Sequence, residues 1–311
     1  YEVQKKEIID LVSKLLSNGT VDAVLGYGPG DIIAEKENED ESPAVPRFFR
    51  DVGELGSLRW DGTCSCNLAK YLLDSKGKLA IVAKPCDARA ITMYLVEKQL
   101  ERDNVYIIGV ECMGMKGKDG SPLPECIECN VKVPPIYDAL IKNPSTGIGA
   151  CNNENNLAGR EEEPVVGLEE NLENSIERFQ KEMSKCIMCF ACRQACYGCY
   201  CTTCFIDRNI PDWTPPDIDM GTKMMYHLGR TMHLAGGCIE CGACERVCPS
   251  GVKIRYLIKE ITKLCNELYG YTAGMDPDET PAIATYKAGD REVGFLGGEE
   301  FETCSHSKGQ D

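Results

Sequence analysis

The sequence has few basic residues and no long apolar run. Its 34 lysines and arginines face 49 aspartates and glutamates, which gives a formal net charge of -15. Because phosphate contacts need a basic surface, this balance argues against a nucleic-acid partner and favours docking to basic patches on other proteins.

Signals for membranes and secretion are also lacking. No segment approaches the roughly 18 consecutive apolar residues that cross a bilayer. The first twenty residues are charged and amphipathic, without the apolar core of a signal peptide. We therefore expect a cytoplasmic protein that does not insert into a membrane. Histidine is scarce as well: His227, His233 and His306 have no metal-ligand spacing, so we expect hydrogen-bonded structural roles for them.

Cysteine, in contrast, is abundant, with 20 residues in a chain of 311. A chain of this length is long enough for two domains and is not a small fold held together by disulfides. The cysteine excess therefore points to metal binding.

The first 143 residues have the pattern of an α/β domain with a small parallel sheet. Helical periodicity at 4–18 is followed by a strand at 21–28 and a polar, proline-containing loop at 29–56. A strand, turn, helix and strand then occupy 78–112, which is the length of a βαβ unit with a right-handed crossover. We also expect short helices at 67–76 and at 134–143.

Two segments further on share one cysteine spacing. Cys186, Cys189 and Cys192 are separated by two residues each, and Cys196 follows after three; Cys238, Cys241, Cys244 and Cys248 repeat the pattern, with Pro249 behind them. In two-cluster ferredoxins, three thiolates so spaced bind one 4Fe-4S cluster and the fourth reaches the other cluster. The spacing predicts Cys186, Cys189, Cys192 and Cys248 on one cluster, and Cys238, Cys241, Cys244 and Cys196 on the second.

Zinc is the alternative to iron and sulfur in this region. Pairs of cysteines two residues apart suit a tetrahedral zinc site. A zinc ribbon, however, does not require a third and a fourth cysteine in each of the two runs. We therefore prefer the iron-sulfur interpretation. We expect an acidic linker at 144–167, an α+β ferredoxin-like domain of the bacterial two-cluster type at 168–270, and an extended arm at 271–311.

The α/β domain has a cysteine set of its own, made of Cys86, Cys112, Cys126 and Cys129. Cys86 and Cys112 each follow a predicted strand, at the sheet edge where ligands gather in parallel sheets. Cys86 also lies where a helix begins, which favours its thiolate. Taken singly, each cysteine could be a half-buried small apolar residue; their shared position instead suggests a third cluster.

Eight cysteines remain. Cys199, Cys201 and Cys204 could supply three ligands of a fourth cluster, with Cys64 or Cys66 as the last. Cys265 falls on the apolar face of a helix and is expected in the core. Cys151 and Cys304 have no ligand partner in the sequence.

Several stretches resemble a known family. KLAIVAKPCDARAI, VYIIGVECMG and CIECNVKVPPIYD look like the beta subunit of hydrogenases that reduce the deazaflavin coenzyme F-420. CIMCFACRQACYGCYCTTCF and CIECGACERVCPSGVKIRYLIKE are similar to the ferredoxin part of the beta subunit of methanogen-type formate dehydrogenase. The resemblance covers most of residues 8–275.

This resemblance implies that Cys86, Cys112, Cys126 and Cys129 hold one 4Fe-4S cluster. It also implies a soluble multi-subunit complex in which the beta subunit passes electrons between a catalytic subunit and a flavin or another partner. Two departures count against FAD and deazaflavin binding. The family opens its first helix with a Gly-Gly pair where this chain has KKEI, and its Gly-rich segment before the ferredoxin part is here a short acidic linker.

The sequence therefore predicts an iron-sulfur electron-transfer subunit without bond chemistry of its own. Its catalytic partner would be a formate dehydrogenase, a hydrogenase or a heterodisulfide-reductase-type protein, and a ferredoxin is a further candidate partner. The alternative is a subunit with FAD that itself oxidises or reduces a deazaflavin or nicotinamide coenzyme.

Overall fold

A computed structural model describes residues 1–30, 43–75, 77–117, 119–144, 172–208, 218–281 and 284. The predicted linker, apart from residue 144, and most of the predicted arm lie outside these residues, as do Cys151, Cys304 and His306. Within the described residues, no helix is both long and apolar enough to cross a membrane.

The N-terminal part is built on a five-stranded sheet with the order β2-β1-β3-β4-β5. Parallel pairing joins β1 to β3, β3 to β4 and β4 to β5, which confirms the predicted α/β class, and only β2 runs antiparallel. The strands are β1 (Ala23–Pro29), β2 (Ala44–Phe49), β3 (Leu79–Ala83), β4 (Val105–Val110) and β5 (Ala139–Ile141).

Both edge strands differ from the sequence prediction. The expected loop at 29–56 contains β2, whose Pro46 is tolerated because it lies on an edge strand. The expected helix at 134–143 is wrong, since this segment contains β5. Pro134 and Tyr137 pack close to Gly109 of β4, so the prolines lead the chain across β4 and do not start a helix.

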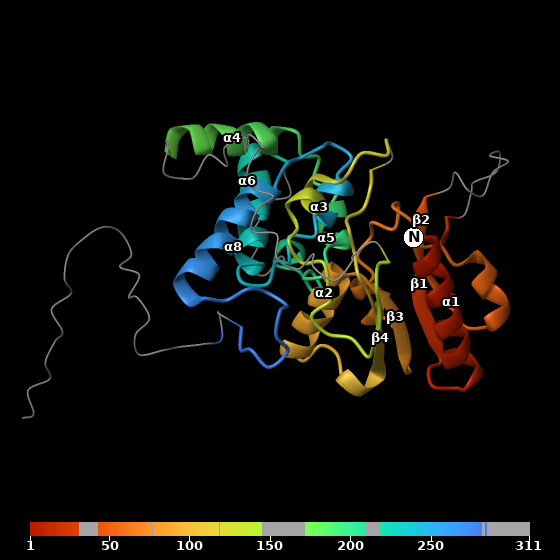
Figure 1. Ribbon diagram of the computed structural model, residues 1–311. Helices are drawn as coiled ribbons and strands as arrows, with labels where there is room; N and C mark the ends of the chain where they lie inside the picture. The colour runs from red at the N-terminus through yellow and green to blue at the C-terminus, as the bar shows by residue number, and fades with distance from the viewer. Residues whose placement is uncertain are drawn as a thin grey trace, which may run out of the picture.

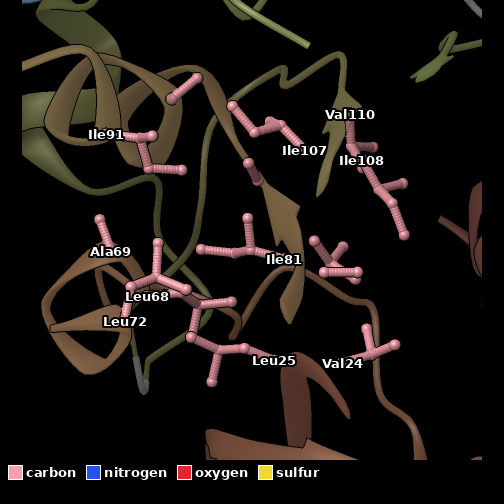
Figure 2. Packing of buried hydrophobic residues seen from close by; sticks show 14 of the residues in the cluster. Val24, Leu25, Leu68, Ala69, Leu72, Ile81, Ile91, Ile107, Ile108 and Val110 are labelled. Carbon is pink, nitrogen blue, oxygen red and sulfur yellow. The ribbon is translucent and has the colours of Figure 1, made fainter. Parts of the chain in front are cut away.

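Helices cover the sheet and close its core. α1 (Glu2–Ser17) contacts β1 and β5, and α2 (Pro85–Val96) contacts β3 and β4. The helix expected at 67–76 is reduced to a 3-10 helix, η3 (Ala69–Leu72). Figure 2 shows Leu25 and Ile81, which are cross-strand partners, on the same side as the η3 residue Leu72, while Val24 points away. Alternate strand residues thus serve opposite faces.

The C-terminal part consists of helices in the residues that the structure describes, with no strand among them from residue 172 onward. The α+β ferredoxin-like fold therefore stays a prediction. α4, α6 and α8 lie together away from the sheet (Figure 1). The helices are α4 (Leu172–Ser184), α5 (Ala191–Ala195), α6 (Met220–His233), α7 (Ala243–Arg246) and α8 (Arg255–Tyr269), and α3 (Pro124–Glu128) precedes them in the N-terminal part.

The two parts share one hydrophobic core. Tyr197, Ile239 and Tyr271 are buried in the same cluster as the sheet residues. Arg89 of α2 donates to the carbonyl oxygens of Ala273 and Ile239. The start of the predicted arm, at 271–274, therefore packs on α2 and is not extended into solvent.

Candidate iron-sulfur sites

The two cysteine runs have the same backbone conformation. Met188 and Phe190 in the first run, and Glu240 and Gly242 in the second, have φ between 54° and 68°. Such angles cost roughly 1 kcal/mol or more for a residue with a side chain, so the repetition marks a constrained loop. The turns direct amides at sulfur: the Met188 N–H donates to Cys186 Sγ and the Glu240 N–H to Cys238 Sγ, both at 3.4 Å.

Each loop leads into a short helix, and the two helices pack together. α5 carries Cys192 and is followed by Cys196, while α7 carries Cys244 and is followed by Cys248. Contact between α5 and α7 brings the last cysteine of each run toward the first three cysteines of the other. The cysteine spacing predicts this arrangement, in which the fourth cysteine of each run joins the first three cysteines of the other run.

Two small cavities divide these eight cysteines. The distal cavity is lined by Cys186, Cys189, Cys192 and Cys248, and Cys244 also reaches it. The central cavity is lined by Cys196, Cys238, Cys241 and Cys244. The structure thus gathers the same two sets that the sequence predicts, and their binding of clusters stays a prediction.

The third predicted set surrounds a further cavity, the N-terminal cavity. Cys86 lies in the first turn of α2, Cys112 follows β4, and Cys126 and Cys129 lie in and just after α3. All four line this cavity. Parallel strands place the residues that follow them at one sheet edge, and the short helix α3 closes the cavity from the other side.

Burial raises the pKa of several of these thiols. It raises the pKa of Cys238 to about 12 and that of Cys244 to about 11. The pKa of Cys86 is also raised, first by burial and then by Asp87, so burial outweighs the helix N-terminus that the sequence suggested. Cys196 differs, because a hydrogen bond from Cys199 and the charge of Arg230 lower its pKa to about 6. At the thiols whose pKa is raised, a metal must displace the proton, which couples metal binding to proton release.

Buried cations compensate thiolate charge, and sequence reasoning missed them. Arg230 is 3% exposed, and four cysteines raise its pKa against the effect of burial. It lines the central cavity. Lys84 is 1% exposed, pairs with Asp87 at 2.8 Å and lines the N-terminal cavity. The only sequence signal for Lys84 was its place in the KPCDAR motif.

Side chains of α6 contact the distal thiols directly. The Nε2 atom of His227 lies 3.4 Å from Cys186 Sγ, and the hydroxyl of Tyr226 lies 3.5 Å from Cys192 Sγ. His227 was expected to have a hydrogen-bonded role, but its partner could not be deduced from the sequence, because α6 lies between the two cysteine runs.

The surplus cysteines fall into two groups. Cys199, Cys201 and Cys204 line a fourth, outer cavity, whereas Cys64 and Cys66 do not line it. Cys64 is fully buried in the sheet core, and burial raises its pKa to about 12; Cys66 packs against the same core. Cys265 on α8 is half-buried.

These arrangements fit thiolate-bound clusters better than a single ion. Among the described residues, no three His, Cys, Asp or Glu side chains converge closely enough to hold one metal ion. Instead, at least four thiols line each of three cavities, and backbone N–H groups point at the sulfurs of Cys112, Cys186, Cys238 and Cys248. Thiolate ligands with hydrogen bonds to sulfur are what iron-sulfur clusters require.

Comparison with known proteins finds no matching family model. Similarity to two curated proteins is extensive. The chain is 24% identical to the F420-dependent formate dehydrogenase subunit beta of Methanocaldococcus jannaschii, covering 80% of this chain and 88% of that protein. It is 25% identical to the F420-dependent formate dehydrogenase 1 subunit beta of Methanococcus maripaludis, covering 88% and 91%. The predicted resemblance is confirmed: the chain is a homologue of formate dehydrogenase beta subunits.

Proposed function

We propose that this chain is the iron-sulfur electron-transfer subunit of a multi-subunit oxidoreductase, with a formate dehydrogenase catalytic subunit as its partner. Cys86, Cys112, Cys126 and Cys129 would hold one 4Fe-4S cluster. The central and distal cysteine sets would hold two more. The choice of partner follows the names of the two relatives, both of which are beta subunits of formate dehydrogenase.

The observation that carries the proposal is the order of the three cavities. Cys241 lines both the N-terminal and the central cavity, and Cys244 lines both the central and the distal cavity. Each pair of neighbouring cavities therefore has a cysteine in common. A row of redox centres at such spacing suits electron transfer along the chain.

Both ends of the row reach the surface. At the distal end Cys189 is exposed, and its neighbour Ile187 is 58% exposed. At the other end Met113 is 55% exposed, and it directly follows Cys112. Exposed apolar side chains beside each terminal cavity would suit contact with an electron donor at one end and an acceptor at the other.

A 4Fe-4S cluster bound by four thiolates supplies one-electron redox chemistry over a wide range of potentials. The chain's own residues would set that range. Amide donors from Gly114, Met188, Glu240 and Val252 point at thiol sulfurs, and the buried cations Lys84 and Arg230 lie beside the thiols. Such donors and cations stabilise the more negative, reduced state.

The test is anaerobic purification of the full chain, followed by iron and sulfide analysis and by electron paramagnetic resonance of the reduced protein. We expect about twelve irons and twelve sulfides per chain, since each cluster has four of each. Reduction by a formate dehydrogenase catalytic subunit with formate should then bleach the cluster absorbance. An iron content near zero with stoichiometric zinc would overturn the proposal.

Flavin analysis separates this proposal from an enzyme that contains FAD. The denatured, anaerobically purified protein should release no stoichiometric flavin, by absorbance and fluorescence. One flavin per chain, together with reduction of a deazaflavin or nicotinamide by the isolated chain, would favour the catalytic subunit instead.

A further inference from the structure

A tight turn joins Cys199 to Cys196, the last predicted ligand of the first cysteine run. The backbone N–H of Cys199 donates to the carbonyl oxygen of Cys196 at 3.3 Å. Lys70, from the N-terminal part, donates through Nζ to the carbonyl oxygens of both cysteines, at 3.2 and 3.4 Å. The turn is therefore fixed at both ends, and it holds the two side chains next to each other, with a hydrogen bond between them.

Gly198 lies inside this turn and has to be a glycine. A Cβ atom at Gly198 would lie 2.8 Å from the side chain of Leu234, which is closer than packed carbon atoms approach each other. The N–H group of Gly198 also donates to the sulfur of Cys196. This sulfur therefore has two neighbours that donate hydrogen bonds, one from the backbone and one from a thiol.

Cys199 does not belong to the set of thiols around the central cavity. Cys196, Cys238, Cys241 and Cys244 line that cavity and already provide the four thiols that one cluster needs. Cys199 lines the outer cavity instead. It can therefore act on a cluster in the central cavity only through the sulfur of Cys196.

One buried cation serves both thiols of the turn. Arg230 is 3% exposed, lines the central and the outer cavity, and interacts with the sulfurs of Cys196 and Cys199. Two negatively charged sulfurs at this distance would repel each other, so only one of them is expected to lose its proton. A cluster ligand must be a thiolate. The negative charge therefore belongs to Cys196, and Cys199 keeps its proton as a hydrogen-bond donor.

We propose that Cys199 is a positioning residue for the central cluster and not a ligand. Its S–H group donates to the sulfur of Cys196, and this hydrogen bond stabilises the additional negative charge of the reduced cluster. The inference rests on the proposed electron-transfer function, since it assigns the control of one reduction potential in the row of three. Removing the donor should lower the potential of the central cluster and leave the other two potentials unchanged.

The test replaces Cys199 in the full, anaerobically purified chain. Cys199→Ala removes the donor, whereas Cys199→Ser retains an O–H group that can donate to the same sulfur. Potentiometric titration followed by electron paramagnetic resonance measures the potentials, and the central signal is the one that Cys196→Ser alters. At the wild-type midpoint potential, Cys199→Ala should lower the ratio of reduced to oxidised central cluster about threefold. Cys199→Ser should recover part of this loss.

Two further variants serve as controls. Cys199→Val also lacks the donor but fills more of the space of the thiol, and it takes the place of Cys199→Ala if that variant does not fold. Cys201→Ala is the matched control, because Cys201 is an exposed cysteine of the same segment, and it should leave all three potentials unchanged. An equal shift in Cys199→Ala and Cys201→Ala would overturn the inference, since the segment and not the hydrogen bond would then set the potential.

Iron and sulfide contents separate failure of this inference from failure of the proposed function. The Cys199 and Cys201 variants should keep about twelve irons and twelve sulfides per chain. Loss of about four irons in both Cys199→Ala and Cys199→Ser would make Cys199 a ligand and overturn the inference, while the electron-transfer proposal would stand. An unchanged central potential in Cys199→Ala with twelve irons has the same meaning. A wild-type chain without iron would overturn both proposals.

Discussion

The Nε2 atom of His227 lies 3.4 Å from the Sγ atom of Cys186. His227 is 3% exposed, and burial, aided by the charge of Arg230, lowers its pKa to about 4. The imidazole is thus neutral at pH 7 and has a single N–H group. Because a thiolate only accepts hydrogen bonds, contact with a cluster-bound Cys186 requires the tautomer with hydrogen on Nε2.

Replacing His227 should lower the reduction potential of the cluster predicted in the distal cavity. His227→Phe keeps an aromatic ring but removes the donor. A hydrogen bond of about 1 kcal/mol corresponds to about 40 mV for a one-electron couple. Potentiometric titration followed by electron paramagnetic resonance measures the shift.

The matched variants for this prediction come from the same helix. His227→Gln retains an N–H donor and should recover part of the potential. Leu228→Ala changes an exposed side chain and should leave the potential unchanged. An equal potential in wild type and His227→Phe would mean that the contact with Cys186 has no role in tuning.

Exchange of the fourth cysteines tests the crossed arrangement. Cys248 lines the distal cavity with Cys186, Cys189 and Cys192, so Cys248→Ser should damage the cluster of the first run. Cys196→Ser should damage the cluster of the second run in the same way. Iron content and the spectra of the reduced variants identify the lost signal. Loss confined to the second run in Cys248→Ser would contradict the crossing.

The local spacing of residues in the sequence predicted the structural features that depend on short-range geometry. Two residues between cysteines recur in both runs, and the loops repeat the same φ angles at Met188 and Glu240. The βαβ unit from β3 to β4 was predicted for the same reason, since its strands are buried apolar runs. Each of these features depends on residues that lie close together in the sequence.

Features that depend on tertiary contact were not predicted. β5 has three residues and forms only because β4 offers an edge. Tyr226 and Arg230 lie on α6, more than thirty residues after Cys192, and nothing in their local sequence indicates that they contact the thiol and the carbonyl oxygen of Cys192, respectively. The core position of Cys64 is likewise set by packing, although the sequence made it a candidate fourth ligand for Cys199, Cys201 and Cys204.

An ion pair links the second cysteine run to the N-terminal part. Arg246 of α7 pairs with Glu125 of α3 and donates to the carbonyl oxygens of Cys241 and Ser65, at 2.7 and 2.8 Å. The Glu125 side chain is 7% exposed. Arg246→Met should therefore destabilise the protein by about 3 kcal/mol, because it leaves a buried carboxylate with only a distant partner.

The midpoint of chemical unfolding under anaerobic conditions measures this loss. Adding Glu125→Leu to Arg246→Met removes the unpaired charge and should restore much of the stability. Lys263→Ala breaks an exposed pair with Glu267 and should cost less than about 1 kcal/mol. If Arg246→Met and Lys263→Ala lower the unfolding midpoint by the same amount, the buried ion pair does not hold the two parts together.

Glu97 gives the protein a stability that depends on pH. Burial raises the pKa of Glu97 above 4.5, although the Tyr200 hydroxyl donates to it at 2.6 Å and opposes the shift. The folded state therefore binds the Glu97 proton more tightly than the unfolded state. The protonated Glu97 side chain therefore contributes fully to stability below pH 4.5. This contribution is lost as pH rises through the pKa that Glu97 has in the folded state.

Glu97→Gln should consequently raise the unfolding midpoint at pH 7 to 8, since glutamine resembles the protonated acid and can still accept from Tyr200. The gain should shrink as pH falls toward 5, within the range where the iron content stays constant. Glu101→Gln, at an exposed position, is the control for removing one negative charge from an acidic protein. A gain that is equal for both variants at every pH would assign the effect to net charge and not to burial of Glu97.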